Sequence, residues 1–161
     1  MVVIETARLV LHPYTPILAA RIADAAPRDP RWAPDYPFEG DQVTARMYLE
    51  AGAPGGLWVP YAVQVRDSGL FVGGAGFHGL PDGDGTVEIG YGLARSARGN
   101  GYATEAAGAL VGAAARAGAR RVTAELEFDN QPSAAVLARL GFTRTDPLRW
   151  SLPLPGWTGS H

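Results

Sequence analysis

The sequence predicts an α+β fold in which a mixed central sheet is flanked by helices. Up to residue 93, short alternating and β-branched runs are joined by turns rich in glycine, aspartate and proline, which is typical of antiparallel strands. After residue 101 the pattern changes, because alanine-rich helical segments alternate with short strands. An antiparallel half followed by a helix–strand half is expected to form one mixed sheet.

The first half is expected to form an antiparallel meander with two inserted helices. The turn Arg66-Asp67-Ser68-Gly69 predicts a hairpin between two of its strands. In the second helix, Val43, Met47 and Ala51 recur at helical spacing and are expected to form its apolar side. The predicted strands are 6–12, 59–65, 70–77 and 87–93, and the predicted helices are 17–25 and 41–51.

The second half begins with a glycine-rich turn and a long helix. No linker, repeat or charge run divides the chain. A single domain over residues 1–155 is therefore expected, with 156–161 as a flexible tail. The predicted elements of this half are helices at 101–117 and 132–140 and strands at 121–128, 142–145 and 149–154.

Composition and charge exclude several classes of function. The formal net charge is -2 and the pI is about 5.9, which disfavours a nucleic-acid partner. The chain lacks cysteine, which excludes disulfides, thiolate metal sites and a cysteine nucleophile. No cluster of His, Asp and Glu has metal-ligand spacing, so no metal is expected. The start does not resemble a signal peptide and the most apolar stretch, 106–115, is too short to span a bilayer, so no membrane partner and a cytoplasmic location are expected.

The segment Arg98-Gly99-Asn100-Gly101-Tyr102-Ala103 follows a strand and opens the long helix. The first amides of a helix have no partner inside it, and the helix dipole is positive there, so such an end holds phosphate. Gly99 and Gly101 let the backbone curl close to a ligand, and Arg98 adds a positive charge. The pattern predicts an anion site, the alternative being a glycine-rich turn that only caps the helix.

A second glycine pattern does not predict a nucleotide site. Gly74-Ala75-Gly76-Phe77-His78-Gly79 satisfies G-x-G-x-x-G. The dinucleotide fingerprint requires a helix to begin there. Leu80-Pro81-Asp82-Gly83 predicts a turn instead, so a dinucleotide site is excluded.

Two motifs resemble the GNAT superfamily of N-acetyltransferases. Arg98-x-x-Gly101-x-Ala103 matches the family's Q/R-x-x-G-x-G/A signature. Glu88-Ile89-Gly90-Tyr91 before it resembles the RimJ/RimL-like branch. That branch's second signature is matched by Asn130-Gln131-Pro132-Ser133 and by Gly141-Phe142. The resemblance covers nearly the whole chain.

The resemblance implies a GNAT-like sheet with a V-shaped split between the fourth and fifth strands, 87–93 and 121–128. Acetyl-CoA is the expected cosubstrate, with its pantetheine along the backbone of Tyr91 and Leu93 and its pyrophosphate on the amides of 99–104. The glycines inside strand 87–93 are consistent with a close approach of another backbone. The cofactor-binding residues implied are Tyr91, Gly92, Leu93, Arg98, Gly99, Asn100, Gly101, Tyr102, Ala103, Thr104, Asn130 and Ser133.

Candidate catalytic residues lie around the expected acetyl group. Glu88, on a central strand, is the candidate general base, the alternative being a structural glutamate. His78 is an alternative base. Ser133 matches a serine of the resembled branch and is expected to hydrogen bond the thioester sulfur. Many GNAT enzymes carry a tyrosine acid at the position of Leu137, so the tyrosine mechanism is not expected here.

The expected function is therefore an acyltransferase that passes acetyl from acetyl-CoA directly to a primary amine, on a protein N-terminus or a small molecule. The alternative is a non-catalytic acyl-CoA binding or sensor domain. The segment 31–38 is rich in aromatic residues and carries Asp35, so it either contacts the amine acceptor or folds back on the core. A homodimer is expected, because residues 150–154 suggest an apolar sheet edge.

Overall fold

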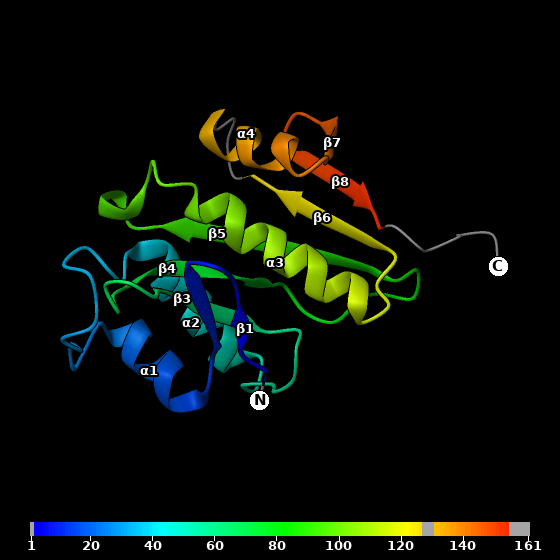
Figure 1. The fold of residues 1–161 in the computed structure, drawn as a ribbon. Coiled ribbons are helices and arrows are strands. Elements are labelled where there is room, and N and C mark those ends of the chain that lie inside the picture. Colours follow the sequence, from blue (N-terminus) through cyan, green and yellow to red (C-terminus); the bar gives the residue numbers. More distant parts are fainter. Residues whose placement is uncertain (1, 127–130, 155–161) are drawn as a thin grey trace.

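The computed structural model describes residues 2–126 and 131–154, and within them all strands join one eight-stranded sheet (Figure 1). Neighbouring strands are antiparallel except for β5 and β6, which are parallel. The predicted α+β class with a mixed sheet is confirmed. In spatial order the strands are β1 (Ile4–Glu5), β2 (Leu9–Pro13), β3 (Pro60–Val65), β4 (Phe71–Phe77), β5 (Thr86–Leu93), β6 (Arg121–Glu125), β8 (Arg149–Pro153) and β7 (Thr143–Asp146).

Helices cover both faces of the sheet. α3 and α4 contact each other on one face, whereas α2 lies against β3 on the other face and α1 packs against α2 (Figure 1). In the described part of the chain, no helix is both long and apolar enough to cross a membrane. The helices are α1 (Pro16–Asp24), α2 (Glu39–Glu50), α3 (Tyr102–Arg116) and α4 (Gln131–Arg139), with a short 3-10 turn, η1 (Arg95–Ala97), before α3.

The alanine-rich sequence of α3 lets this helix lie close to the centre of the sheet. Its buried side consists almost entirely of alanine, so the helix axis can approach β4 and β5. Val87, Ile89 and Leu93 of β5 are buried as well. Close packing there fixes the start of α3 relative to the end of β5. The buried residues of α3 are Ala106, Ala107, Leu110, Ala113 and Ala114.

The first predicted strand, 6–12, is wrong in its first half. Thr6 begins a turn that separates β1 from β2, and its N–H donates to the Leu9 carbonyl at 2.9 Å. The Leu9 N–H in turn donates to the Thr6 hydroxyl at 3.0 Å. A threonine side chain that binds nearby backbone competes with strand pairing, which explains the interruption. Every other predicted element begins and ends within three residues of an observed one, except that the predicted end of strand 121–128 lies outside the described residues.

The predicted apolar side of α2 is also wrong. Val43 and Met47 are 41% and 63% exposed, and Ala51 follows the helix as its exposed C-cap. An apolar pattern cannot identify a buried acid, or a tyrosine whose hydroxyl is paired inside the protein. The buried side of α2 is formed by Asp41, Ala45 and Tyr48.

β5 and β6 pair over only the first half of β5. Their parallel register runs from Thr86 opposite Arg121 to Ile89 opposite Ala124. β5 continues to Leu93, and the two strands diverge beyond their paired part (Figure 1). The expected V-shaped split between the fourth and fifth predicted strands is therefore present, and it lies between β5 and β6 because the first predicted strand is divided in two.

The expected apolar edge near the C-terminus is absent. β8 lies between β6 and β7, so Trp150 and Ser151 are buried inside the sheet. The outer strand is β7, whose residues Thr143–Asp146 are polar and exposed. β7 and β8 form a hairpin with a short connection. The sequence pattern of each strand alone did not show which of the two would be the outer strand. The predicted tail, 156–161, lies outside the described residues.

Candidate active site

The glycine-rich turn leaves the start of α3 open. Gly99 and Gly101 have φ angles of 83° and 81°, which L side chains rarely adopt. Gly101 is the N-cap of α3 and provides no side-chain cap, so the first-turn amides have no partner within the helix. A Cβ placed at Gly99 would meet no atom within 4 Å. The turn therefore presents free N–H groups and the positive end of the helix dipole to open space.

The polar side chains of this turn support its backbone. Nε of Arg98 donates to the Leu93 carbonyl at 3.2 Å, which keeps the guanidinium beside the end of β5. Nδ2 of Asn100 donates to the Ala97 carbonyl at 3.0 Å. Arg98 thus supplies positive charge at the turn, whereas the Asn100 side chain holds the preceding 3-10 turn.

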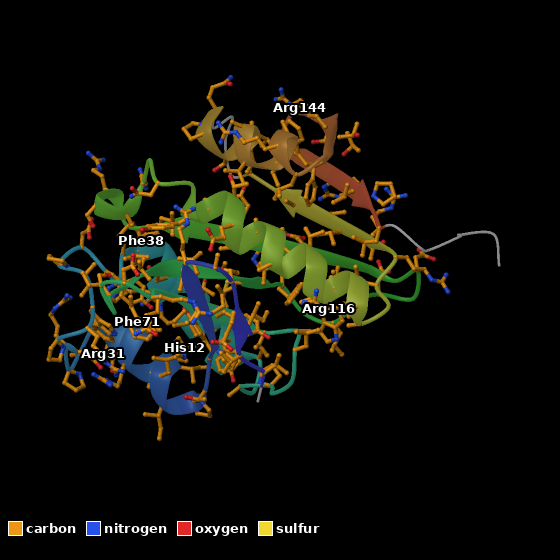
Figure 2. The ribbon with its side chains drawn as sticks, in the orientation of Figure 1. His12, Arg31, Phe38, Phe71, Arg116 and Arg144 are labelled. Carbon is orange, nitrogen blue, oxygen red and sulfur yellow. The ribbon has the colours of Figure 1, made fainter. Side chains whose placement is uncertain are left out.

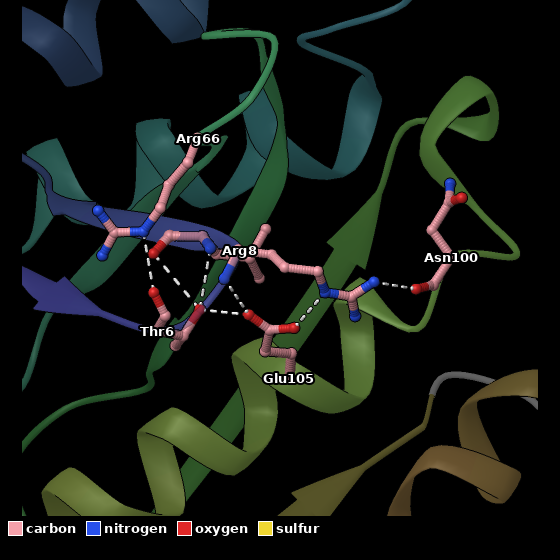
Figure 3. A network of polar contacts seen from close by, with 6 residues as sticks. Thr6, Arg8, Arg66, Asn100 and Glu105 are labelled. Atoms are coloured by element: carbon pink, nitrogen blue, oxygen red, sulfur yellow. Dashed lines mark hydrogen bonds and ion pairs between the residues drawn. The ribbon is translucent and has the colours of Figure 1, made fainter.

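Arg8 is a second cation at this turn, which sequence reasoning missed. Its Nη1 donates to the Asn100 carbonyl at 2.8 Å and its Nε to the Glu105 carboxylate at 2.7 Å (Figure 3). The guanidinium also lies 4.8 Å from the ring centroid of Tyr102. The sequence placed Arg8 in a strand far from the turn, and only the fold brings them together.

Glu105 is the acid in the first turn of α3, and the same network neutralises it. Thr6 and Arg8 both donate hydrogen bonds to its carboxylate (Figure 3). Burial pushes the pKa of Glu105 upward, but these hydrogen bonds and the Arg8 charge outweigh burial and lower the pKa overall. The carboxylate is thus ionised and paired, so it does not oppose an anion bound at the turn.

The backbone of β5 exposes polar groups to the split. The His78 N–H donates to the Glu88 carbonyl at 2.9 Å, and the register between β4 and β5 continues without a shift. In an antiparallel pair only alternate residues bond to the neighbour, so the even-numbered residues of β5 face β4. The N–H and C=O groups of Tyr91 and Leu93 therefore point into the split.

Tyr91 also reaches across the split with its side chain. Its hydroxyl donates to the Ser133 carbonyl, at the start of α4, at 3.0 Å. Burial raises the pKa of Tyr91 to about 12, although this hydrogen bond acts in the opposite direction. The hydroxyl stays protonated near neutral pH and remains a donor. The sequence predicted a role only for the backbone of Tyr91. Asn130, a predicted cofactor-binding residue, lies outside the described residues.

His78 and Glu88, which the sequence offered as alternative bases, form one pair. Nδ1 of His78 lies 2.9 Å from Oε2 of Glu88, next to the last paired residues of β5 and β6. A Cβ at Gly90 would lie only 2.6 Å from Nε2 of His78. A side chain at position 90 would displace the imidazole that covers this glycine, which is a different constraint from the cofactor approach expected from the sequence.

The aromatic loop before α2 folds back on the protein. Trp32 and Tyr36 are buried, and Arg31 and His12 lie close to Phe71 (Figure 2). Asp35, which was expected to contact an acceptor amine if the loop bound one, instead accepts hydrogen bonds from the Ser96 side chain and backbone at 2.7 and 2.9 Å. These bonds lower the pKa of Asp35. The loop is thereby tied to η1, beside the glycine-rich turn.

Residues 8–143 match the family description "Acetyltransferase (GNAT) domain". The chain belongs to the GNAT acetyltransferase family. The resemblance drawn from the two sequence motifs is thereby confirmed. An uncharacterized N-acetyltransferase of Bacillus subtilis (strain 168), YjdG, is 44% identical over 78 residues, which are 48% of this chain and 46% of that protein. The chain spans about half the length of the curated relatives that it matches.

Solved GNAT structures share the fold over almost the whole chain. The ribosomal-protein-S5-alanine acetyltransferase from Vibrio fischeri has a TM-score of 0.70 and 19% identity, covering 98% of this chain and 99% of its own. RimL, a ribosomal L7/L12 alpha-N-protein acetyltransferase in complex with coenzyme A, has a TM-score of 0.67 and 19% identity, covering 95% and 98%. At this identity the likeness establishes the fold.

Within this GNAT fold, the signature residues converge on the split. Ala103 and Thr104 are half-buried in the first turn of α3, and Ser133 is half-buried in α4 across from Tyr91. Leu137, at the position where many GNAT enzymes have a tyrosine, is fully buried in the core. Among the described residues, no group of His, Asp and Glu is arranged to hold a metal ion.

Proposed function

We propose that this chain is an N-acetyltransferase that moves an acetyl group from acetyl-CoA to a primary amine by direct attack. One observation carries the proposal. The split between β5 and β6 has an open backbone edge and an open helix terminus on one side, and the His78–Glu88 pair at its base. A thioester bound along the edge would have a proton acceptor within reach.

The residues of the turn and the split fit acetyl-CoA. The amides at the start of α3, with Arg98 and Arg8 beside them, suit a pyrophosphate. The N–H and C=O groups of Tyr91 and Leu93 suit the amides of pantetheine, which would bond to β5 as a strand does. When bound, acetyl-CoA supplies an activated acetyl thioester.

In the proposed reaction, the amine nitrogen bonds to the acetyl carbonyl carbon as the carbon–sulfur bond breaks. The amine gives up one proton, and coenzyme A leaves as a thiolate that gains one. We assign removal of the amine proton to the His78–Glu88 pair, in which Glu88 orients and charge-balances the imidazole. No covalent enzyme intermediate is required, which agrees with the absence of cysteine.

We assign stabilisation of the leaving thiolate to hydroxyl groups at the start of α4. The Tyr91 hydroxyl is 3.0 Å from the Ser133 carbonyl, so it lies close to the Ser133 side chain. Both groups flank the split on the side of α3 and α4. Because Leu137 is a core residue, the Ser133 hydroxyl is proposed to donate a hydrogen bond to the sulfur. The Tyr91 hydroxyl would join it by turning its single proton from the Ser133 carbonyl to the sulfur.

The acceptor class is a primary amine, on a protein N-terminus or a small molecule. The protein N-terminus is supported by the two ribosomal-protein acetyltransferases that share the fold. An acceptor screen with acetyl-CoA, read by mass spectrometry together with free coenzyme A, tests the proposal. The chain contains no lysine, so self-acetylation of side-chain amines cannot mask the result. Binding of acetyl-CoA without turnover of any amine would support the alternative, a non-catalytic acyl-CoA sensor.

A homodimer is also proposed, on different support from the apolar edge expected from the sequence. β1 and β7 are the two outer strands of the sheet, and outer strands can pair with another chain. Sedimentation at micromolar concentration tests this, because a monomer alone would exclude it.

A further inference from the structure

Asp41 is a buried acid that the proposed chemistry does not use. Only 4% of its surface is exposed. Its Oδ2 accepts a hydrogen bond from the Phe38 N–H at 3.2 Å, at the start of α2. Among the described residues, no arginine or histidine forms an ion pair with it. A buried carboxylate without a cation is costly, because its charge is neither solvated nor paired.

The second oxygen of Asp41 faces a patch of the sheet that has no side chains. Oδ1 lies 2.9 Å from where a Cβ on Gly74 would be. Gly74 is opposite Gly92, and the next pair on the same face is Gly76 opposite Gly90. Gly74, Gly90 and Gly92 thus form a floor, which we call the glycine floor. Gly76 is buried and lies outside this floor, because a Cβ there would lie 2.5 Å from the Pro60 backbone.

The glycine floor joins Asp41 to the proposed catalytic pair. At one end, a Cβ on Gly92 would lie 3.2 Å from the Phe38 ring, beside Asp41. At the other end, the His78 ring covers Gly90. Gly90 and Gly92 are two residues apart along one strand, which is about 7 Å. Gly74, Gly90 and Gly92 keep partial solvent exposure, so the floor is not sealed.

Two tyrosine hydroxyls share the surroundings of Asp41. Tyr36 is 1% exposed, and its hydroxyl has no hydrogen-bond partner among the described residues. Burial raises the pKa of Tyr36 and of Tyr14, and the Asp41 charge raises both further. Burial also raises the pKa of Asp41 itself to about 7, against the Phe38 hydrogen bond. Among the described residues, the Asp41 carboxylate has no positively charged partner, and a bound cation would supply one.

We propose that Asp41 binds a second positively charged group of the acceptor, about 7 Å from the amine that reacts beside His78. The acceptor class is then a diamine, or an amine whose carbon chain carries a further ammonium or guanidinium group. This inference rests on the proposed acetyl transfer. Asp41 is a specificity-determining residue in this arrangement, and it takes no part in the bond changes.

The test compares 1,5-diaminopentane with 1-aminopentane as acceptors. Wild-type protein is expected to favour the diamine in kcat/KM by tenfold or more, through KM. Asp41→Asn keeps a carbonyl oxygen for the Phe38 N–H but loses the charge, so it is expected to bring the ratio close to one while monoamine rates are retained. Glu39→Gln removes the same charge from an exposed position in the same helical turn, and it should leave the ratio unchanged.

A second variant covers the case in which Asp41→Asn fails to fold. Gly74→Ala keeps the carboxylate but places a methyl group 2.9 Å from Oδ1, so it should also abolish the preference. A wild-type ratio near one, or a preference that survives in both variants, overturns the inference. If neither amine is acetylated, the proposed acetyl transfer to these amines is wrong, but the Asp41 subsite is still untested by the rates. Calorimetric titration of the diamine into the protein with coenzyme A then decides, because binding to wild type but not to Asp41→Asn supports the subsite and no binding refutes it.

Discussion

His78, which directly follows β4, and Glu88 of β5 meet at 2.9 Å, with the imidazole lying over the backbone of Gly90. The pair stands where β6 leaves β5, on the face away from Tyr91. An imidazole oriented by a carboxylate is a familiar proton acceptor, and here the missing side chain at position 90 makes room for it. In the proposed reaction, this pair accepts the proton that the amine loses.

Glu88→Gln is expected to lower turnover mainly at low pH. More of the amine is protonated there, so proton removal limits the rate most strongly. The measurement is a pH–rate profile on one good acceptor. Glu125→Gln is the matched control, because Glu125 lies on the adjacent strand and pairs with Arg149. A wild-type profile in Glu88→Gln would remove Glu88 from the proton path.

Gly90→Ala tests the same pair from the backbone side. The added methyl group would lie 2.6 Å from Nε2 of His78 and must displace the ring. We expect kcat to fall about tenfold or more, corresponding to about 1.4 kcal/mol, with acetyl-CoA affinity unchanged. Gly83→Ala, where a Cβ would meet nothing within 4 Å, is the control. Equal kcat in both variants would show that the position of His78 is unimportant.

Ser133→Ala and Tyr91→Phe are each expected to slow turnover modestly at every pH, with acetyl-CoA binding little changed. Loss of one hydrogen bond to the thiolate costs about 1–2 kcal/mol, or roughly five- to thirtyfold in rate. If both hydroxyls serve the same sulfur, the double variant will deviate from additivity. Weaker acetyl-CoA binding with intact turnover at saturation would make Ser133 a binding residue only.

Gly101→Glu is expected to abolish acetyl-CoA binding. A side chain and a negative charge would occupy the phosphate position, next to Arg8, whose Nη2 lies 3.3 Å from the Cβ position. Gly118→Glu is a fair control, because Gly118 also has a positive φ of 89° but lies at the far end of α3. Calorimetry that gives wild-type affinity for Gly101→Glu would place the pyrophosphate elsewhere.

Asp41 should make the protein less stable as pH rises. Burial raises the pKa of Asp41 from its ordinary value of 3.8 to about 7 in the folded state, so the folded protein holds this proton more tightly than the unfolded chain does. Its contribution is fully present below the unfolded pKa and is lost as pH rises through about 7. Relative to Asp41→Asn, the wild type should lose on the order of 3 kcal/mol between pH 5 and 8. The free energy of unfolding is measured for both proteins from urea curves at several pH values. The same pH dependence in wild type and in Asp41→Asn would contradict the assignment.

The sequence predicts those features of the site that are built from residues close together along the chain. The turn from Arg98 to Ala103 was predictable because strand, glycines and helix follow one another along the chain. Arg8 was not, because it reaches the turn only through the pairing of β2 within the sheet. Asp41 was missed since a charged residue is normally assigned to the exposed side of a helix.

The strand order shows the same limit. The hairpins follow from neighbouring segments and were predicted from them. The split between β5 and β6 was expected only from the family resemblance. The insertion of β8 between β6 and β7 depends on a long-range choice of partner, which a local pattern does not contain. Likewise, His78 and Glu88 were each identified, but their hydrogen bond depends on the register of β4 and β5.

Direct acetyl transfer to an amine can be followed in a single-turnover experiment. Purified protein is mixed with an equimolar amount of acetyl-CoA and an acceptor identified in the screen. Free coenzyme A, acetylated amine and the intact mass of the protein are then followed in the same samples. Direct transfer should give equal amounts of coenzyme A and acetylated amine at every time, with no acetyl adduct on the lysine-free chain. Release of coenzyme A without acetylated amine, or an acetyl-protein that forms before the product, would contradict it.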